Sequence, residues 1–147
     1  MDTKITRQSV LALLAGDWAG YVARFEALPP ADQATFLEKQ GYKRLADLLA
    51  HIVAWWEEGM QAIPRFQSDP AAKLQDFDVN SFNARAVAQV QAVPEAEEIK
   101  VFEAARRKFQ DFTRQLTDED FKDERIVTQF KWELVNHLEE HRIKNLS

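Results

Sequence analysis

The residues best suited to chemistry are three histidines, the only ones in the chain. His137 and His141 are four residues apart near the C-terminus, and His51 lies far earlier in the sequence. Side chains four residues apart share one face of a helix at about 6 Å, so both imidazoles can reach a single ion. This pair therefore predicts a site for a divalent metal.

The position of the pair on its helix favours the same interpretation. On a helical wheel of about 100° per residue, both histidines fall inside the apolar sector that Phe130, Leu134 and Leu138 define. Ring nitrogens on a core-facing side need partners, because a buried polar group without a hydrogen bond is costly. A metal ion would be such a partner. The alternative is a set of core histidines that other protein groups satisfy.

The spacing also limits the kind of metal site. The zinc-protease motif requires glutamate directly after its first histidine, where this chain has Leu138. If His51 joins the pair, three imidazoles suit catalytic zinc, nickel or iron(II) better than a closed structural site; cobalt and manganese stay open. Glu133 and Asp47 each precede a histidine by one turn, so either carboxylate is a candidate to hold an imidazole N–H; the alternative is a surface carboxylate.

Apolar residues at spacings of three and four predict four long helices that position the histidines. The first begins at a Thr3 or Thr6 cap and runs through Gly16 and Gly20 to about residue 28. The others cover residues 43–63, limited by Pro64, then the segment that Pro94 opens, and the segment from about Arg125. These four helices predict an all-α four-helix bundle.

Short extra helices are expected in the connections of this bundle. One covers residues 31–39 and is stopped by Gly41, and the other runs to about residue 92 from a cap at Ser81 or Asn80. The tryptophans are expected in the core and in pocket walls, and Trp55 shares the face of His51.

Composition narrows the classes of function. The chain has 147 residues, 46% hydrophobic and 29% charged, which predicts a single domain spanning residues 1–147. It has no cysteine and a formal net charge of −5, which argues against thiolate chemistry and against binding to nucleic acid or to an anionic membrane. No segment approaches a bilayer-spanning length, and residues 1–8 lack the features of a secretory signal, so we expect a cytoplasmic protein.

Three short motifs carry a resemblance to a known family. They are Asp47-Leu48-Leu49-Ala50-His51-Ile52, Val79-Asn80-Ser81-Phe82-Asn83 and the His137-x-x-x-His141 pair. In this order and separation, over nearly the whole chain, they resemble the DinB/YfiT-like superfamily of metal-dependent four-helix-bundle proteins, and the middle segment looks more like its ClbS/DfsB branch. The resemblance implies that His51, His137 and His141 bind a divalent metal and that the protein forms a homodimer.

The resemblance also suggests a reaction class, since characterised relatives include thiol-dependent S-transferases and a mycothiol-dependent isomerase. We therefore expect a metal-dependent S-transferase or hydrolase that acts on a small electrophile, with a low-molecular-weight thiol as an optional co-substrate. A thiol bound to the metal would lose its proton and become a nucleophile. Some members of the ClbS/DfsB branch lack the three histidines, so the alternative is a metal-free small-molecule-binding or self-protection protein. A third reading is an interaction module that only dimerises.

Overall fold

The structure is a computed structural model that describes residues 4–143; residues 1–3 and 144–147 lie outside that description. Within the described range the chain is helical and contains no strand, which confirms the all-α prediction for those residues. The elements are α1 (Arg7–Ala15), α2 (Tyr21–Glu26), α3 (Pro30–Gln40), α4 (Leu45–Ser68), α5 (Val79–Ala88), α6 (Glu95–Arg114), η1 (Asp120–Lys122), α7 (Glu124–Phe130), η2 (Lys131–Asn136) and α8 (His137–Glu140).

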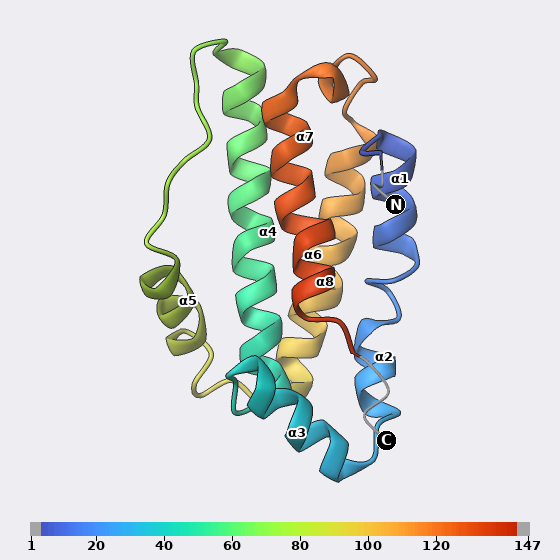
Figure 1. The fold of residues 1–147 in the computed structure, drawn as a ribbon, viewed down its shortest axis with the longest axis vertical. Coiled ribbons are helices and arrows are strands. Elements are labelled where there is room, and N and C mark those ends of the chain that lie inside the picture. The colour runs from blue at the N-terminus through green and yellow to red at the C-terminus, as the bar shows by residue number, and fades with distance from the viewer. Residues whose placement is uncertain (1–3, 144–147) are drawn as a thin grey trace.

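Four helical segments lie side by side along the long axis of the molecule: α1, α4, α6 and the continuous run α7–η2–α8 (Figure 1). The helix α4 contacts α5, α6, α7 and η2, while α1 packs on α6 and η2. Their shared interior is rich in aromatic rings, and the fully buried ones include Trp18, Trp56, Phe102, Phe109 and Phe130. Burial of such rings supplies much of the hydrophobic stabilisation. Since α4 contacts α5, α6, α7 and η2, it is the central element of this packing.

The predicted first helix is wrong in one respect, because it is interrupted between α1 and α2. Thr6 caps α1, as expected of one of the two candidates, whereas Thr3 lies outside the described residues. The helix ends at Gly16, and the irregular turn that follows lets Trp18 reach the core with no exposed surface. Burial of this indole explains why the chain does not continue as one straight helix.

The predicted end of the second helix is also wrong. Pro64 lies inside α4, which continues for another turn to Ser68. The guanidinium of Arg125 accounts for this extension, because it donates to the Phe66 carbonyl at 2.8 Å and lies over the Phe66 ring. A carbonyl at the end of a helix needs such an outside donor.

The connections follow the prediction more closely. Gly41 ends α3 with a φ of +84°, a conformation that glycine adopts without strain, and Pro94 stands directly before α6. The helix α5 is shorter than predicted, since it ends at Ala88, and its cap is Asp78 rather than Asn80 or Ser81. The loop between α4 and α5 runs along one side of the molecule (Figure 1).

Candidate metal centre

The structure brings the three histidines together, which confirms the expected convergence. His51 comes from the middle of α4, His137 opens α8, and His141 follows directly after α8. One ring nitrogen of each lies within 4.8 Å of the other two, and His51 Nε2 is 3.0 Å from His141 Nε2. All three side chains are buried. These residues can therefore hold one metal ion.

The proton of His51 is fixed by two neighbours. The indole N–H of Trp55 donates to Asn83 Oδ1 at 2.8 Å, and because an indole only donates, the atom that it meets is the amide oxygen. His51 Nδ1 lies 2.9 Å from the same oxygen, so Nδ1 carries the hydrogen. The Nε2 of the neutral ring then presents a lone pair to the other histidines.

The other two rings are held in the same way. His137 Nδ1 lies 3.1 Å from the main-chain carbonyl of Glu133, which can only accept a hydrogen bond. His141 Nδ1 lies 2.6 Å from Gln40 Oε1. His51 and His137 therefore donate through Nδ1 to an oxygen and keep an unprotonated Nε2, and His141 has the same arrangement in the tautomer that donates to Gln40 Oε1.

Ring nitrogens with free lone pairs are suitable ligands for a cation. In that tautomer of His141, its Nε2 and the Nε2 of His51 face each other as two lone pairs at 3.0 Å, an arrangement that a positive charge beside them would stabilise. In a tetrahedral site with metal–nitrogen bonds of about 2.0–2.1 Å, the ligand atoms are separated by roughly 3.3 Å, close to the distance here. Three imidazoles leave room for a further ligand, which is typical of catalytic rather than structural zinc sites.

The electrostatics of the cluster keep the rings neutral, as metal ligands must be. Burial lowers the pKa of His137 to about 3, and the nearby His51 and His141 rings contribute. Burial and the His51 ring lower the pKa of His141 to about 4. Burial also lowers the pKa of His51, against the opposing effect of the hydrogen bond that His51 donates to Asn83. Near pH 7 the cluster thus offers uncharged donors.

A local irregularity in the helix positions His137. The segment η2, directly before it, is π-helical, a rare form that often occurs at functional sites. Two buried indoles explain it: Trp56 Nε1–H donates to the Glu133 carbonyl at 2.9 Å, and Trp18 Nε1–H donates to the Leu134 carbonyl at 3.2 Å. Outside donors of this kind disrupt the regular ladder of a helix.

The end of α8 is anchored by two distant elements. The Tyr21 hydroxyl donates to the His141 carbonyl at 2.6 Å, and Gln40 holds the ring of the same residue. Gln40 is the last residue of α3, and Gly41 ends that helix there. Segments from the first third of the chain therefore fix the last histidine.

The two carboxylates considered from the sequence do not hold the imidazoles. His137 contacts the main-chain carbonyl of Glu133 and not its carboxyl. Asp47 forms an ion pair with Arg44 at 3.1 Å instead of contacting His51. Glu133 is not a surface residue either, since it is 2% exposed. Its Oε2 has no hydrogen-bond partner among the described residues. Burial, with the charge of Glu58, raises the pKa of this carboxyl well above its usual value.

A cavity of about 320 Å³ adjoins the histidines. His137 and Glu133 line it, together with Trp55, which confirms that Trp55 is a pocket-wall residue. A larger groove of about 750 Å³ lies between α4 and α6, but no histidine lines it. We therefore take the smaller cavity as the one that chemistry at the cluster would use.

Sequence reasoning missed the roles of Asn83 and Gln40. Asn83 belongs to a segment that the family resemblance already singled out, which was the available signal. Gln40 carried no signal, because only the tertiary fold brings the end of α3 to His141.

Comparison of the chain with protein-family models, curated proteins and solved structures finds no match. In residues 4–143, no helix combines the length and the apolar character needed to cross a membrane.

Proposed function

We propose that this protein is a metal-dependent enzyme whose His51, His137 and His141 hold a divalent ion, with zinc, nickel or iron as the best candidates. The observation that carries the proposal is the convergence of three Nε2 lone pairs, each ring being oriented by an oxygen on its far side. Such oriented histidines are a regular feature of metal centres, and the oxygens that hold them contribute to metal affinity.

The reaction we propose is thiol S-transfer or hydrolysis on a small electrophilic molecule. A divalent ion bound there would lower the pKa of a coordinated water or thiol and so supply a nucleophile at neutral pH. The substrate would enter by the cavity that His137 lines. Glu140 lines the same cavity, and its Oε2 lies 4.0 Å from His141 Nε2. This carboxylate is therefore placed to accept the proton that the nucleophile loses.

We also propose that the arrangement of the four helical segments is a four-helix bundle of the DinB/YfiT-like type. The side-by-side packing of α1, α4, α6 and the α7–η2–α8 run supports it (Figure 1). The cluster draws its histidines from the second and fourth of these segments, as the resemblance implies.

The second candidate is a metal-free small-molecule-binding or self-protection protein of the ClbS/DfsB type. The cavity favours it, because a volume of about 320 Å³ beside a buried polar cluster can hold a molecule without any ion.

Metal analysis of untagged protein separates the two candidates. We expect close to one ion per chain in the wild type and loss of that ion in both His137→Ala and His141→Ala. Glu139→Gln, an exposed carboxylate on the same helix, is the matched control and should keep the ion. A metal-free wild type whose melting temperature ignores added zinc, nickel and iron would support the binding protein instead.

A further inference from the structure

The cavity beside the histidines has walls of two kinds. On one side, successive turns of the α7–η2–α8 run place Gln129, Glu133 and His137 along it. On the other side are Trp55 of α4 and the segment from Gln75 to Val79. A volume of about 320 Å³ corresponds to roughly ten water molecules, so it suits a small organic molecule.

The charged side chains of this cavity all have one sign. Asp76 and Glu140 line it as exposed carboxylates, and no lysine or arginine of the described residues lines it. Carboxylates around a cavity with low-dielectric walls create a negative potential, which attracts cations and repels anions. The charge pattern therefore favours a positively charged ligand.

Aromatic rings supply a second preference of the same kind. Trp55, Phe77 and Trp132 line the cavity, and Trp132 is among the few large apolar side chains exposed to solvent. Trp55 is held rigidly, since it stacks on Phe82 at 4.0 Å and meets Phe77 edge-on at 5.2 Å. Faces of tryptophan rings attract cations, and the rings also bury apolar groups.

The third and independent observation is the carboxyl of Glu133. It lines the cavity, is 2% exposed and leaves Oε2 without a hydrogen-bond partner among the described residues. A buried carboxyl with an unpaired oxygen is costly, so a ligand in the cavity that donates N–H groups to the same carboxyl would offset part of that cost.

Gly59 of α4 makes the room for this carboxyl. A Cβ at position 59 would lie 2.9 Å from Glu133 Cγ, which is closer than real contacts allow. Glycine in the middle of a helix is less favourable than alanine, because it loses more backbone freedom on folding. The chain thus accepts a weaker helix and an unpaired acid at the same point, as expected where a ligand completes the contacts.

We propose that this cavity binds a small organic cation, an ammonium or amidinium group on a short apolar or aromatic body. The N–H groups would donate to Glu133, and the body would lie against Trp55 and Trp132. That the bound cation is a substrate rests on the proposed function, because the cavity is the one that the proposed enzyme would use.

A matched set of three probes tests it: benzylamine, benzyl alcohol and benzoate, which are positive, neutral and negative molecules of similar size. Binding is followed by NMR shifts of the indole N–H signals, with a chelator present so that no metal contributes. We expect benzylamine to bind at least tenfold more tightly than benzyl alcohol, and benzoate to bind no better than the alcohol. The signals of Trp55 and Trp132 should shift, and those of the fully buried Trp18 and Trp56 should not.

Variants then locate the preference. Glu133→Gln should weaken benzylamine at least fivefold and leave benzyl alcohol unchanged. Glu140→Gln, on an exposed side chain, gives a second readout that does not depend on the buried acid. Asp111→Asn, which lines the separate groove between α4 and α6, is the control and should change neither probe.

The inference is overturned if benzoate binds as tightly as benzylamine, or if neither Glu133→Gln nor Glu140→Gln alters the preference for the amine. Zinc binding, measured separately by calorimetry, keeps the two proposals apart. A chain that binds zinc but not benzylamine would contradict only the substrate class. A chain that binds benzylamine but no metal would contradict the metalloenzyme and leave the cation site standing.

Discussion

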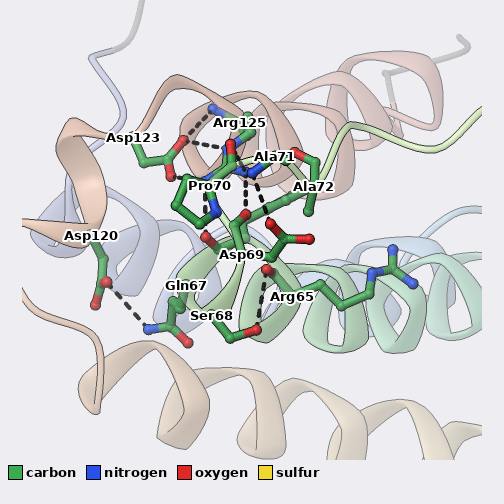
Figure 2. Close-up of polar contacts among 11 residues, drawn as sticks. Arg65, Gln67, Ser68, Asp69, Pro70, Ala71, Ala72, Asp120, Asp123 and Arg125 are labelled. Atoms are coloured by element: carbon green, nitrogen blue, oxygen red, sulfur yellow. Dashed lines mark hydrogen bonds and ion pairs between the residues drawn. The ribbon is translucent and has the colours of Figure 1, made fainter.

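Two polar clusters lie between the region of α4 and the α7–η2–α8 run, and they differ in how many of their polar atoms have a partner within the protein. Arg125, at the start of α7, has a partner for every guanidinium nitrogen. Nε and one terminal nitrogen contact Asp123, and the terminal nitrogens also donate to the carbonyls of Phe66, Asp69 and Ala72. Figure 2 shows Arg125 beside Asp123, Asp69 and Ala72. The histidines match only their outer nitrogens, and the inner lone pairs face one another. The first cluster, around Arg125, is complete within the protein. The second, formed by the three histidines, leaves its inner nitrogens open to a cation, and we call it the open cluster.

The largest expected effect is stabilisation of the second cluster by zinc. An ion that binds only the folded chain raises the free energy of unfolding by about 4 kcal/mol when its free concentration is 1,000 times its dissociation constant. We expect an increase of this order in urea unfolding of the wild type with zinc, and none in His137→Ala. Arg125→Ala should keep the gain, because its cluster does not contact the histidines. Zinc-independent unfolding of the wild type would contradict the comparison.

The next effect is the loss of the complete cluster. Arg125→Ala removes hydrogen bonds to one carboxylate and several carbonyls, so we expect a clear fall in the free energy of unfolding, larger than the loss of one exposed ion pair would cause. Arg125→Lys should recover less than half, because an ammonium cannot reach these acceptors at once. The measurement is urea unfolding in the presence of a chelator. Arg114→Ala, which breaks an exposed ion pair with Asp111, should cost less than about 0.5 kcal/mol. Equal losses of unfolding free energy in Arg125→Ala and Arg114→Ala would contradict the view that the Arg125 cluster stabilises the fold.

The two clusters should lose their contributions to stability at different pH values. The folded pKa values of His137 and His141, about 3 and about 4, lie below the unfolded value of 6.5, so the unfolded chain binds more protons as pH falls. Metal-free protein should therefore lose stability below pH 6.5, by about 2 kcal/mol between pH 7 and pH 5.5.

The Arg125 cluster responds at lower pH. The hydrogen bonds from Arg125 hold the pKa of Asp123 below its usual value, so its contribution is present above about pH 4 and is lost only below that. Urea unfolding at several pH values, with a chelator, measures both ranges. A wild type whose stability is constant from pH 7 to 5.5 would contradict the prediction. In His137→Gln, which has one titrating ring fewer, the free energy of unfolding should depend less steeply on pH than in the wild type.

The sequence was sufficient to predict the residues of the open cluster but not the groups that support them. His137 and His141 are related by helical spacing, which is local information, and His51 was added from the expected packing of the second and fourth helices and from the family resemblance. Asn83 and Gln40 depend on how α5 and the end of α3 fold against other elements, and no spacing rule connects them to the histidines. The sequence instead offered the carboxylates of Glu133 and Asp47 as candidates to hold an imidazole N–H, and neither contacts a histidine ring in the structure.

The helix boundaries show the same division between local and tertiary information. Gly41 and Pro94 act through their own backbone preferences, and both predictions held. Pro64 was expected to end α4, but a guanidinium from a distant helix stabilises the turn beyond it. The π-helical segment η2 likewise depends on indoles from other elements, so an ideal helical wheel did not show it.

A smaller effect tests the tight contact beside the open cluster. Gly59→Ala places a Cβ 2.9 Å from Glu133 Cγ, and we expect a loss of about 1–2 kcal/mol in spite of the better helix propensity of alanine. In a Glu133→Ala background the obstacle is gone, so the same substitution should stabilise by about 0.5–1 kcal/mol. Urea unfolding of the four proteins gives the coupling directly. A Gly59→Ala effect of the same sign in both backgrounds would show that the glycine is not kept for Glu133.

The smallest effect concerns the hydrogen bond that orients the open cluster from outside. Trp55→Phe keeps an aromatic ring against Phe77 and Phe82 but removes the N–H that fixes the Asn83 amide, and with it the tautomer of His51. Loss of an outer support of this kind weakens metal affinity by about tenfold at the lower end, so calorimetry should show a rise of that size in the zinc dissociation constant. Trp132→Phe is the matched control, since Trp132 lines the same cavity without a hydrogen bond to Asn83, and its zinc affinity should stay within twofold of the wild type. If both variants weaken zinc equally, the cavity wall rather than the His51 tautomer controls affinity, and the open cluster would be less preorganised than its hydrogen bonds indicate.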